Sequence, residues 1–89
     1  MSPFLGGSAT AFADQVAGGF TTLSSVQLRR MSAAEIDQLR FELERILRDL
    51  RSQIVPQDDL QALQVRNRKI SRVNGALQQI QAFRGRRGG

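Results

Sequence analysis

Apolar residues recur at helical spacing in two stretches of the chain, one on each side of Pro56. The first stretch advances in steps of three and four residues, and the second does so once a polar slot at Arg66 is allowed. Such steps place side chains along one side of an α-helix. The pattern therefore predicts two amphipathic helices that fold against each other. The positions are Ile36, Leu39, Leu43, Ile46 and Leu50, then Leu63, Ile70, Val73, Leu77 and Ile80.

The first helix has clear start and stop signals. Ser32 and Glu35 have the spacing of a capping box, in which each side chain accepts a hydrogen bond from the other residue's backbone amide. Pro56 disfavours helical backbone at Val55, the residue before it. We therefore expect the first helix over about 33–54.

The second helix is expected over about 59–83. Asp58 or Gln57 can cap its N-terminus with a side-chain oxygen. Its weak point is Asn74-Gly75, since glycine costs about 1 kcal/mol relative to alanine inside a helix. The apolar stripe stays in phase beyond these two residues, so a single continuous helix is predicted.

A short connection around Pro56 makes the two helices run antiparallel. The predicted fold class is all-α, with a coiled-coil-like antiparallel helical hairpin over 32–83. Leu47 and Ile54 widen the first stripe, and Leu60 and Phe83 extend the second. Because two helices cannot cover stripes of this width, we expect two hairpins to pair into a four-helix bundle. The predicted interface is Ile36, Leu39, Leu43, Ile46, Leu47, Leu50, Leu63, Ile70, Val73, Leu77 and Ile80.

The segments on either side of the hairpin differ from it in composition. Residues 1–27 are rich in Gly, Ser, Thr and Ala and are expected to form a flexible arm, in which 9–17 could be a short helix. Phe12 and Val16 would share one side of that helix, so the arm could dock on the hairpin or on a partner. Residues 84–89 contain no apolar anchor and are expected to be a basic, disordered tail.

The residue types that are missing argue against catalysis. The chain has no His, Cys, Tyr or Trp, so the commonest general base, the best nucleophile and the soft metal ligands are absent. We expect no enzyme activity, catalytic residue, metal, cofactor or small-molecule substrate. The lack of cysteine suits a reducing compartment, which predicts a cytoplasmic, intracellular protein. No apolar run is long enough to cross a membrane.

Positive charge is concentrated in the second helix and the tail. The net charge is +5, and no acidic residue follows Arg66. Basic side chains close together on a helix can bind phosphates, but they can equally pair with acidic residues of the first helix or of a second chain. No aromatic residue is interleaved for base stacking, so binding to nucleic acid would use its backbone. The candidates for polyanion binding are Arg66, Arg68, Lys69, Arg72, Arg84, Arg86 and Arg87.

Three groups of residues follow the pattern of a known family. They are Leu28-Arg29-Arg30-Met31-Ser32 with Glu35-Ile36, Leu47 with Leu50-Arg51-Ser52-Gln53, and Arg68-Lys69-Ile70-Ser71-Arg72-Val73. Through them the chain resembles the small two-helix protein of the large ribosomal subunit, universal family number twenty-nine. The resemblance implies a helical hairpin that lies on ribosomal RNA near the exit of the peptide tunnel. It also implies phosphate contacts for Arg51, Arg68, Lys69 and Arg72.

Two functions follow from these patterns. The first is a non-enzymatic protein–protein interaction module, a helical hairpin that associates with itself as a dimer or docks on a helical partner. The small size of the chain favours it, because an isolated hairpin of about 55 residues is marginally stable. The alternative is binding of RNA, ribosomal RNA included, or another polyanion through the basic second helix and the arginine-rich tail.

Overall fold

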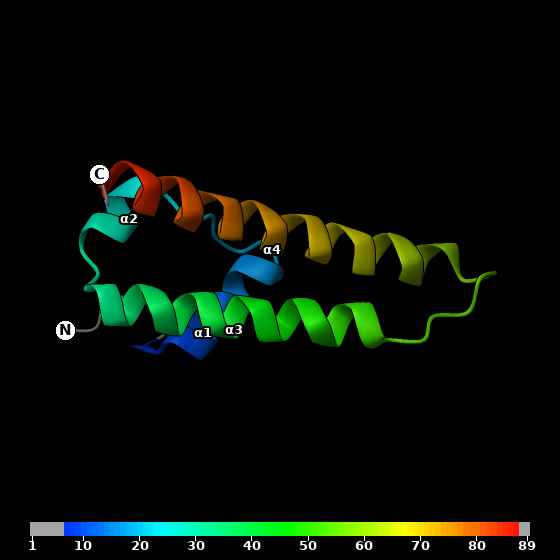
Figure 1. Cartoon of the computed structure of the whole chain (residues 1–89). Helices are drawn as coiled ribbons and strands as arrows, with labels where there is room; N and C mark the ends of the chain where they lie inside the picture. Colours follow the sequence, from blue (N-terminus) through cyan, green and yellow to red (C-terminus); the bar gives the residue numbers. More distant parts are fainter. Residues whose placement is uncertain (1–6, 88–89) are drawn as a thin grey trace.

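The computed structural model describes residues 7–87 of the chain, apart from the side chains of 86 and 87. Within that range all regular structure is helical, which confirms the predicted all-α class. The helices, in chain order, are α1 (Ala9–Ala17), α2 (Ser25–Arg29), α3 (Ala33–Ser52) and α4 (Leu60–Arg87) (Figure 1). None of them is both long and apolar enough to pass through a bilayer, a statement that covers the described part of the chain.

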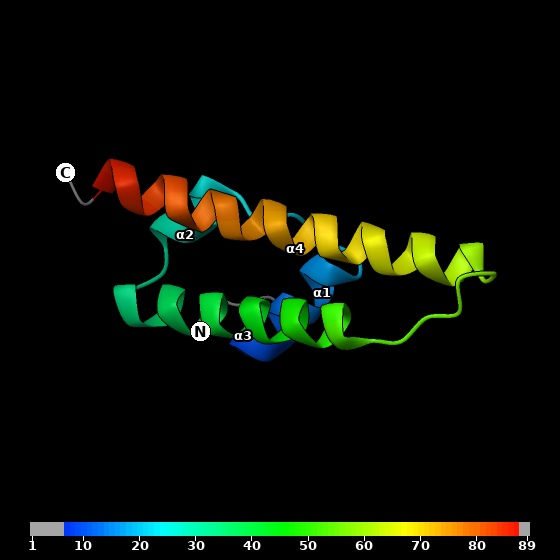
Figure 2. The same cartoon turned by 45° about the vertical axis from the view of Figure 1, so that its right-hand side comes forward.

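The two long helices, α3 and α4, pack against each other and set the length of the molecule. From the loop over 53–59, α4 runs back toward the end at which α3 begins (Figures 1 and 2). At 28 residues, α4 is about 42 Å long, because an α-helix rises about 1.5 Å per residue. This is nearly the whole 46 Å length of the chain.

The predicted capping box at the start of α3 is confirmed. The hydroxyl of Ser32 accepts a hydrogen bond from the Glu35 amide at 3.1 Å, and the Glu35 carboxylate accepts one from the Ser32 amide at 2.8 Å. A second capping box, which the sequence analysis did not predict, opens α2 with Ser24 and Gln27. Local side-chain chemistry thus fixes the start of both helices.

The connection between α3 and α4 is longer than predicted. Helix α3 ends at Ser52, two residues earlier than expected, because Gln53 already has extended backbone with φ −66° and ψ 131°. Helix α4 begins at Leu60, because the residue that caps it is Asp59, neither Asp58 nor Gln57. The Asp59 carboxylate accepts from the Ala62 amide at 3.0 Å.

Helix α4 also continues beyond its predicted end at Phe83. It extends to Arg87, so the predicted disordered tail is helical over 84–87, and 88–89 lie outside the described residues. The helix passes through Asn74-Gly75 without a break, as the continuous apolar stripe predicts.

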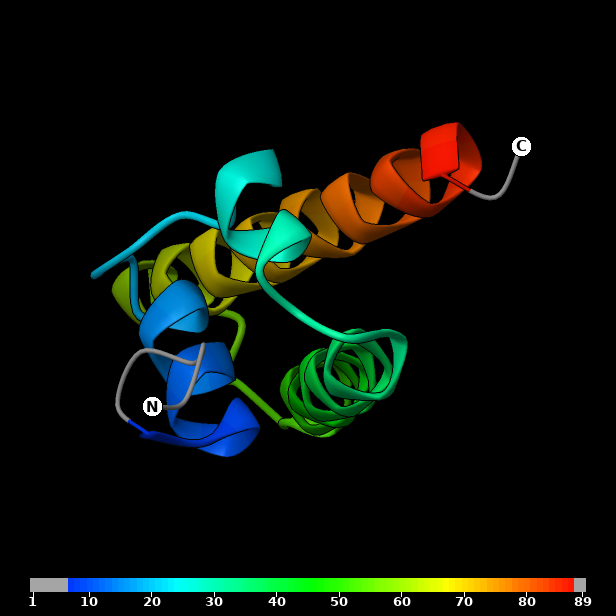
Figure 3. The ribbon, with the colours of Figure 1, turned by 90° about the vertical axis from the view of Figure 1, so that its left-hand side faces the viewer.

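The expectation of a flexible arm is corrected for residues 7–27, which form α1 and α2. Helix α1 packs against both α3 and α4, and α2 packs against α4. Figure 3, which looks along α3, shows α1 beside α3 and beneath α4. The physical reason is that Phe12, 0% exposed, and Val16, 3% exposed, point from one side of α1 into the core. The arm was expected to dock either on the hairpin or on a partner. In the structure, α1 packs on α3 and α4, and residues 1–6 lie outside the described range.

A single close approach fastens the C-terminus of α1 to α4. Nη1 of Arg72 donates to the Ala17 carbonyl oxygen at 3.2 Å, and its guanidinium packs against Gly19. Gly19 has φ +80°, and a Cβ atom there would lie 2.7 Å from Cζ of Arg72. Glycine is therefore needed at this turn for both its backbone conformation and its lack of a side chain.

All four helices contribute to one core. It contains residues of α1, the linker that follows it and α2, together with the part of α3 and α4 nearest to them. The largest fully buried side chains are Phe12, Leu28, Ile36, Leu39, Leu43, Val73 and Ile80. The expectation that a second copy must cover the apolar stripes is therefore wrong for this part of the molecule, because α1 covers it within one chain.

Candidate interaction surface

Helix α1 divides the apolar seam between α3 and α4 into two parts. Among the predicted interface residues, those buried are Ile36, Leu39, Leu43, Leu50, Val73 and Ile80. Those left half-buried are Ile46, Leu47, Leu63, Ile70 and Leu77. The structure thus places most of the predicted interface in the chain's own core, and only part of it remains accessible.

The division follows from the lengths of the helices. With nine residues, α1 spans about 13 Å, a third of the length of α4. Its C-terminus lies at Arg72, through the hydrogen bond to Ala17. The ends of α3 and α4 next to the 53–59 loop project beyond α1 and α2 (Figures 1 and 2).

Large apolar side chains are exposed at this projecting end. Ile54 is 98% exposed, Leu60 68% and Val65 45%, while Val55 and Leu63 are half-buried. We call these five residues the tip surface. Ile54 was expected to widen the first apolar stripe and Leu60 to extend the second. Ile54 lies in the loop instead, because α3 ends at Ser52, and Leu60 is exposed at the start of α4.

Val65 was not among the residues predicted for the interface. The predicted stripe of α4 has the right phase, because Val73 and Ile80 are buried and Leu63, Ile70 and Leu77 are half-buried. Val65 lies beside this stripe and is 45% exposed. The signal that could have revealed it is an apolar residue that lies outside the stripe and close to the loop.

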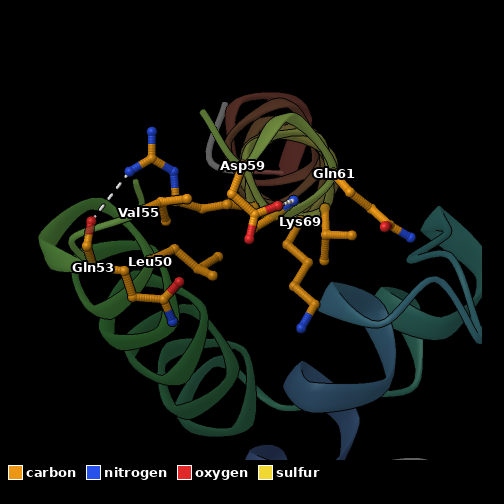
Figure 4. A pocket seen from close by; sticks show the side chains of 9 residues that line it. Leu50, Gln53, Val55, Asp59, Gln61 and Lys69 are labelled. Atoms are coloured by element: carbon orange, nitrogen blue, oxygen red, sulfur yellow. Dashed lines mark hydrogen bonds between the residues drawn. The ribbon is translucent and has the colours of Figure 1, made fainter. Parts of the chain in front are cut away.

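A groove of about 430 Å³ lies between the last turn of α3 and the first turns of α4 (Figure 4). Leu50 from α3 and Ala62 and Val65 from α4 give it an apolar lining. Asp59 and Lys69, both labelled in Figure 4, lie at the same opening. The groove therefore offers apolar surface and charges of both signs.

Arg66 ties the two sides of this groove together. Its Nη1 donates to the carbonyl oxygen of Gln53, just past the end of α3, at 3.2 Å (Figure 4). A cation at a helix C-terminus compensates the partial negative charge of the unpaired carbonyl groups. The Nε atom of Arg66 is buried and has no hydrogen-bond partner among the described residues. Arg66 therefore stabilises the end of α3, and only part of its guanidinium remains available to a ligand.

Two basic side chains near the groove have no hydrogen-bond or ion-pair partner in the described part of the chain. Arg68 is exposed and Lys69 is half-buried, and neither forms a hydrogen bond or ion pair with any described side chain or backbone group. Lys69 is four residues before buried Val73, so it lies on the core-facing side of α4 at the point where the cover of α1 ends. This stretch of the seam therefore presents a positive charge where an apolar residue would be expected.

The other predicted polyanion-binding residues are dispersed. Arg72 holds the end of α1, and Arg84 forms an ion pair with Asp37 of α3. The side chains of Arg86 and Arg87 lie outside the described range. Among the predicted basic residues whose side chains the structure describes, only Arg68 and Lys69 therefore remain together and unpaired.

Most acidic residues of α3 pair within that helix. Arg45 lies 2.9 Å from the Glu42 carboxylate and 3.4 Å from that of Asp49. The hydrogen bond that Arg45 donates to Glu42 is the main reason that the pKa of Arg45 is raised above its ordinary value. Such exposed pairs stabilise a helix only weakly. Near the C-terminus, within the part of the chain that the structure describes, Arg84 pairs with Asp37 of α3.

The described residues contain no group of three acidic side chains placed to hold a metal ion. Comparison with models of known protein families finds no match to the chain. Comparisons with curated proteins and with solved structures find no match either.

Proposed function

We propose that the chain is a non-enzymatic helical interaction module that binds a protein helix through the tip surface. The observation that supports this function best is the exposure of three large apolar side chains, Ile54, Leu60 and Val65, at the uncovered end of the seam. Large apolar side chains that gather on a surface are typical of contact sites, whereas apolar residues exposed singly are common on any protein.

The groove beside these residues suits a helix. An amphipathic helix that lies along Leu50 and Val65 would continue the packing that α1 provides over the rest of the seam. In this proposal the antiparallel, coiled-coil-like hairpin of α3 and α4 is a scaffold. The covered part of the seam stabilises it, and the tip surface is the part that binds.

The alternative function, binding of RNA or another polyanion, has narrower support. Arg68 and Lys69 are adjacent and unpaired among the described residues, so both charges are available to a phosphate. Arg66, Arg72 and Arg84 are already engaged within the chain. Ribosomal RNA, which the family resemblance implies as a ligand, stays a prediction of this alternative.

Photo-cross-linking in the native cells tests the proposed function. A chain with p-benzoylphenylalanine in place of Leu60 should form a cross-link to a protein helix, identified by sequencing the joined peptides. The same probe in place of Val26, which is exposed on α2 away from the tip, should not form it. A second substitution, Val65→Asp, should abolish the product at position 60. Equal cross-linking at both positions, or none at position 60, would contradict the proposal.

A further inference from the structure

We infer that the tip surface binds a second copy of this chain, tip to tip about a two-fold axis. The acidic loop end of each copy then faces the basic residues near the groove of the other. This inference rests on the proposed function, because it names the partner of the same surface.

The charges of the tip are separated along the chain axis. Asp58 and Asp59 lie at the loop end, immediately before α4 begins, and Arg68 and Lys69 lie about ten residues further along that helix. A rise of about 1.5 Å per residue puts the two groups about 15 Å apart. At that distance they cannot form ion pairs within one chain.

Each group has charge left to offer to a partner. Asp58 is exposed, and neither it nor Arg68 and Lys69 forms an ion pair with a described side chain. Asp59 uses one carboxylate oxygen to cap α4, and its side chain opens on the groove (Figure 4). Asp58 and Asp59 therefore lie at the loop end of the tip and Arg68 and Lys69 further in, and none of the four forms an ion pair with a described side chain. The exposed Arg51 lies on α3 at the same end, one residue before that helix ends.

A two-fold axis turns this arrangement into charge complementarity. In an isologous pair, every contact occurs twice, with the two residues exchanged between the copies. Two tips that overlap in opposite directions place the Asp58 end of each copy beside Arg68 and Lys69 of the other. A second copy of the chain therefore supplies both the acidic and the basic groups that this pairing needs.

Helix α1 limits how far the two tips can overlap. It reaches α4 at Arg72, so a second copy can enter the seam only up to about that residue. The free length from Asp59 to Arg72 is about 13 residues, or about 20 Å. In this overlap, Asp58 and Asp59 of one copy lie beside Lys69 of the other. The arrangement that buries the apolar residues therefore also brings the opposite charges together.

The same overlap covers the exposed apolar residues. Ile54, Leu60 and Val65 of each copy would be removed from water together, which supplies the apolar part of the contact. The two hairpin ends would form a local four-helix arrangement, as predicted for the stripes as a whole. Because the overlap is only about 20 Å long, we expect it to bury less area than a standard interface, and the dimer should be weak and concentration-dependent.

The test uses two charge-reversed variants of the purified full chain. One carries Asp58→Lys with Asp59→Asn, since asparagine keeps the cap of α4. The other carries Arg68→Glu with Lys69→Glu. Sedimentation velocity at low salt, from about 10 μM to 1 mM, should show the wild type shifting toward a dimer. Each variant alone should need at least a tenfold higher concentration to dimerise.

The decisive sample is the equimolar mixture of the two variants. In that mixture, the reversed loop of one chain meets the reversed helix of the other, and the unchanged groups meet as in the wild type. Heterodimers should form within about threefold of the wild-type concentration dependence. The control Arg29→Glu with Arg30→Glu makes the same charge change on α2, away from the tip, and should dimerise like the wild type.

Three outcomes would overturn the self-pairing. They are a wild-type chain that stays monomeric to 1 mM, a mixture that fails to recover, and a control that loses pairing as strongly as the tip variants. If a charge variant loses helical content by circular dichroism, Val65→Ser is tested in its place. This substitution should raise the concentration needed for dimerisation at least fivefold. An unchanged concentration dependence would overturn the pairing. A monomeric chain whose position 60 still cross-links to a different protein would refute the pairing and leave the proposed function standing.

Discussion

At the scale of single residues, two glycines of this chain have opposite roles. Gly19 has φ +80° and lies against the guanidinium of Arg72, whereas Gly75 is inside α4 with no neighbouring atom within 4 Å of where a Cβ would be. The first is required by the fold, and the second only lowers the stability of the helix around it.

We expect Gly75→Ala to raise the free energy of unfolding by about 1 kcal/mol, because alanine restricts the unfolded chain and favours the helix. Gly19→Ala should lower it, since alanine is strained at that φ and its Cβ would collide with Arg72. Urea unfolding followed by circular dichroism measures both changes. A destabilising Gly75→Ala would mean that a neighbour does approach this part of α4.

A second residue-scale prediction compares Phe12 and Phe20, which lie in the same arm. Phe12→Ala should cost about 3–5 kcal/mol, because it leaves a cavity in the core under α1. Phe20→Ala should change stability by less than about 0.5 kcal/mol, since Phe20 is 85% exposed. The midpoints of urea unfolding compare the two variants directly. Equal effects would show that α1 does not cover the seam.

At the scale of elements, local chemistry predicted more than did the apolar pattern. Ser32 and Glu35 gave the start of α3 correctly, because a capping box involves only neighbouring residues. Pro56 placed the stop within two residues for the same reason. The all-α class and the two long helices could thus be predicted from the sequence.

The cover by α1 could not be predicted in the same way. A helix of nine residues is unstable alone, so α1 exists through its packing on α3 and α4. The spacing of Phe12 and Val16 showed that docking was possible, but a spacing does not identify the surface that receives it. The tip surface could not be predicted either, because Val65 lies beside the apolar stripe and the length of seam left open depends on where α1 ends.

The N-terminus of α4 supplies an element-scale prediction. Asp59→Ala should destabilise the protein by about 1 kcal/mol, because it removes the hydrogen bond to the Ala62 amide. Asp58→Ala should have a much smaller effect, since no described amide depends on its side chain. Thermal unfolding of the two variants under the same conditions distinguishes them. A larger effect at Asp58 would mean that the cap has been assigned to the wrong residue.

At the scale of the whole molecule, the basic charge of the chain is distributed between structural and free positions. If the chain binds polyanions, Arg68→Ala with Lys69→Ala should lower the salt concentration that elutes it from heparin. Arg84→Ala should lower it less, because Arg84 is paired with Asp37. Elution at the same salt concentration for the wild type and the double variant would remove Arg68 and Lys69 from the polyanion alternative.

The tip surface exists because α1 covers one part of the seam between α3 and α4 and leaves the other part open. Amide hydrogen exchange, resolved by residue on a dilute sample, tests that division most directly. We expect strong protection at Leu39, Leu43 and Val73 and within α1, and much weaker protection over 60–66. Uniform protection along α3 and α4, or exchange in α1 as fast as in a free peptide, would contradict the account.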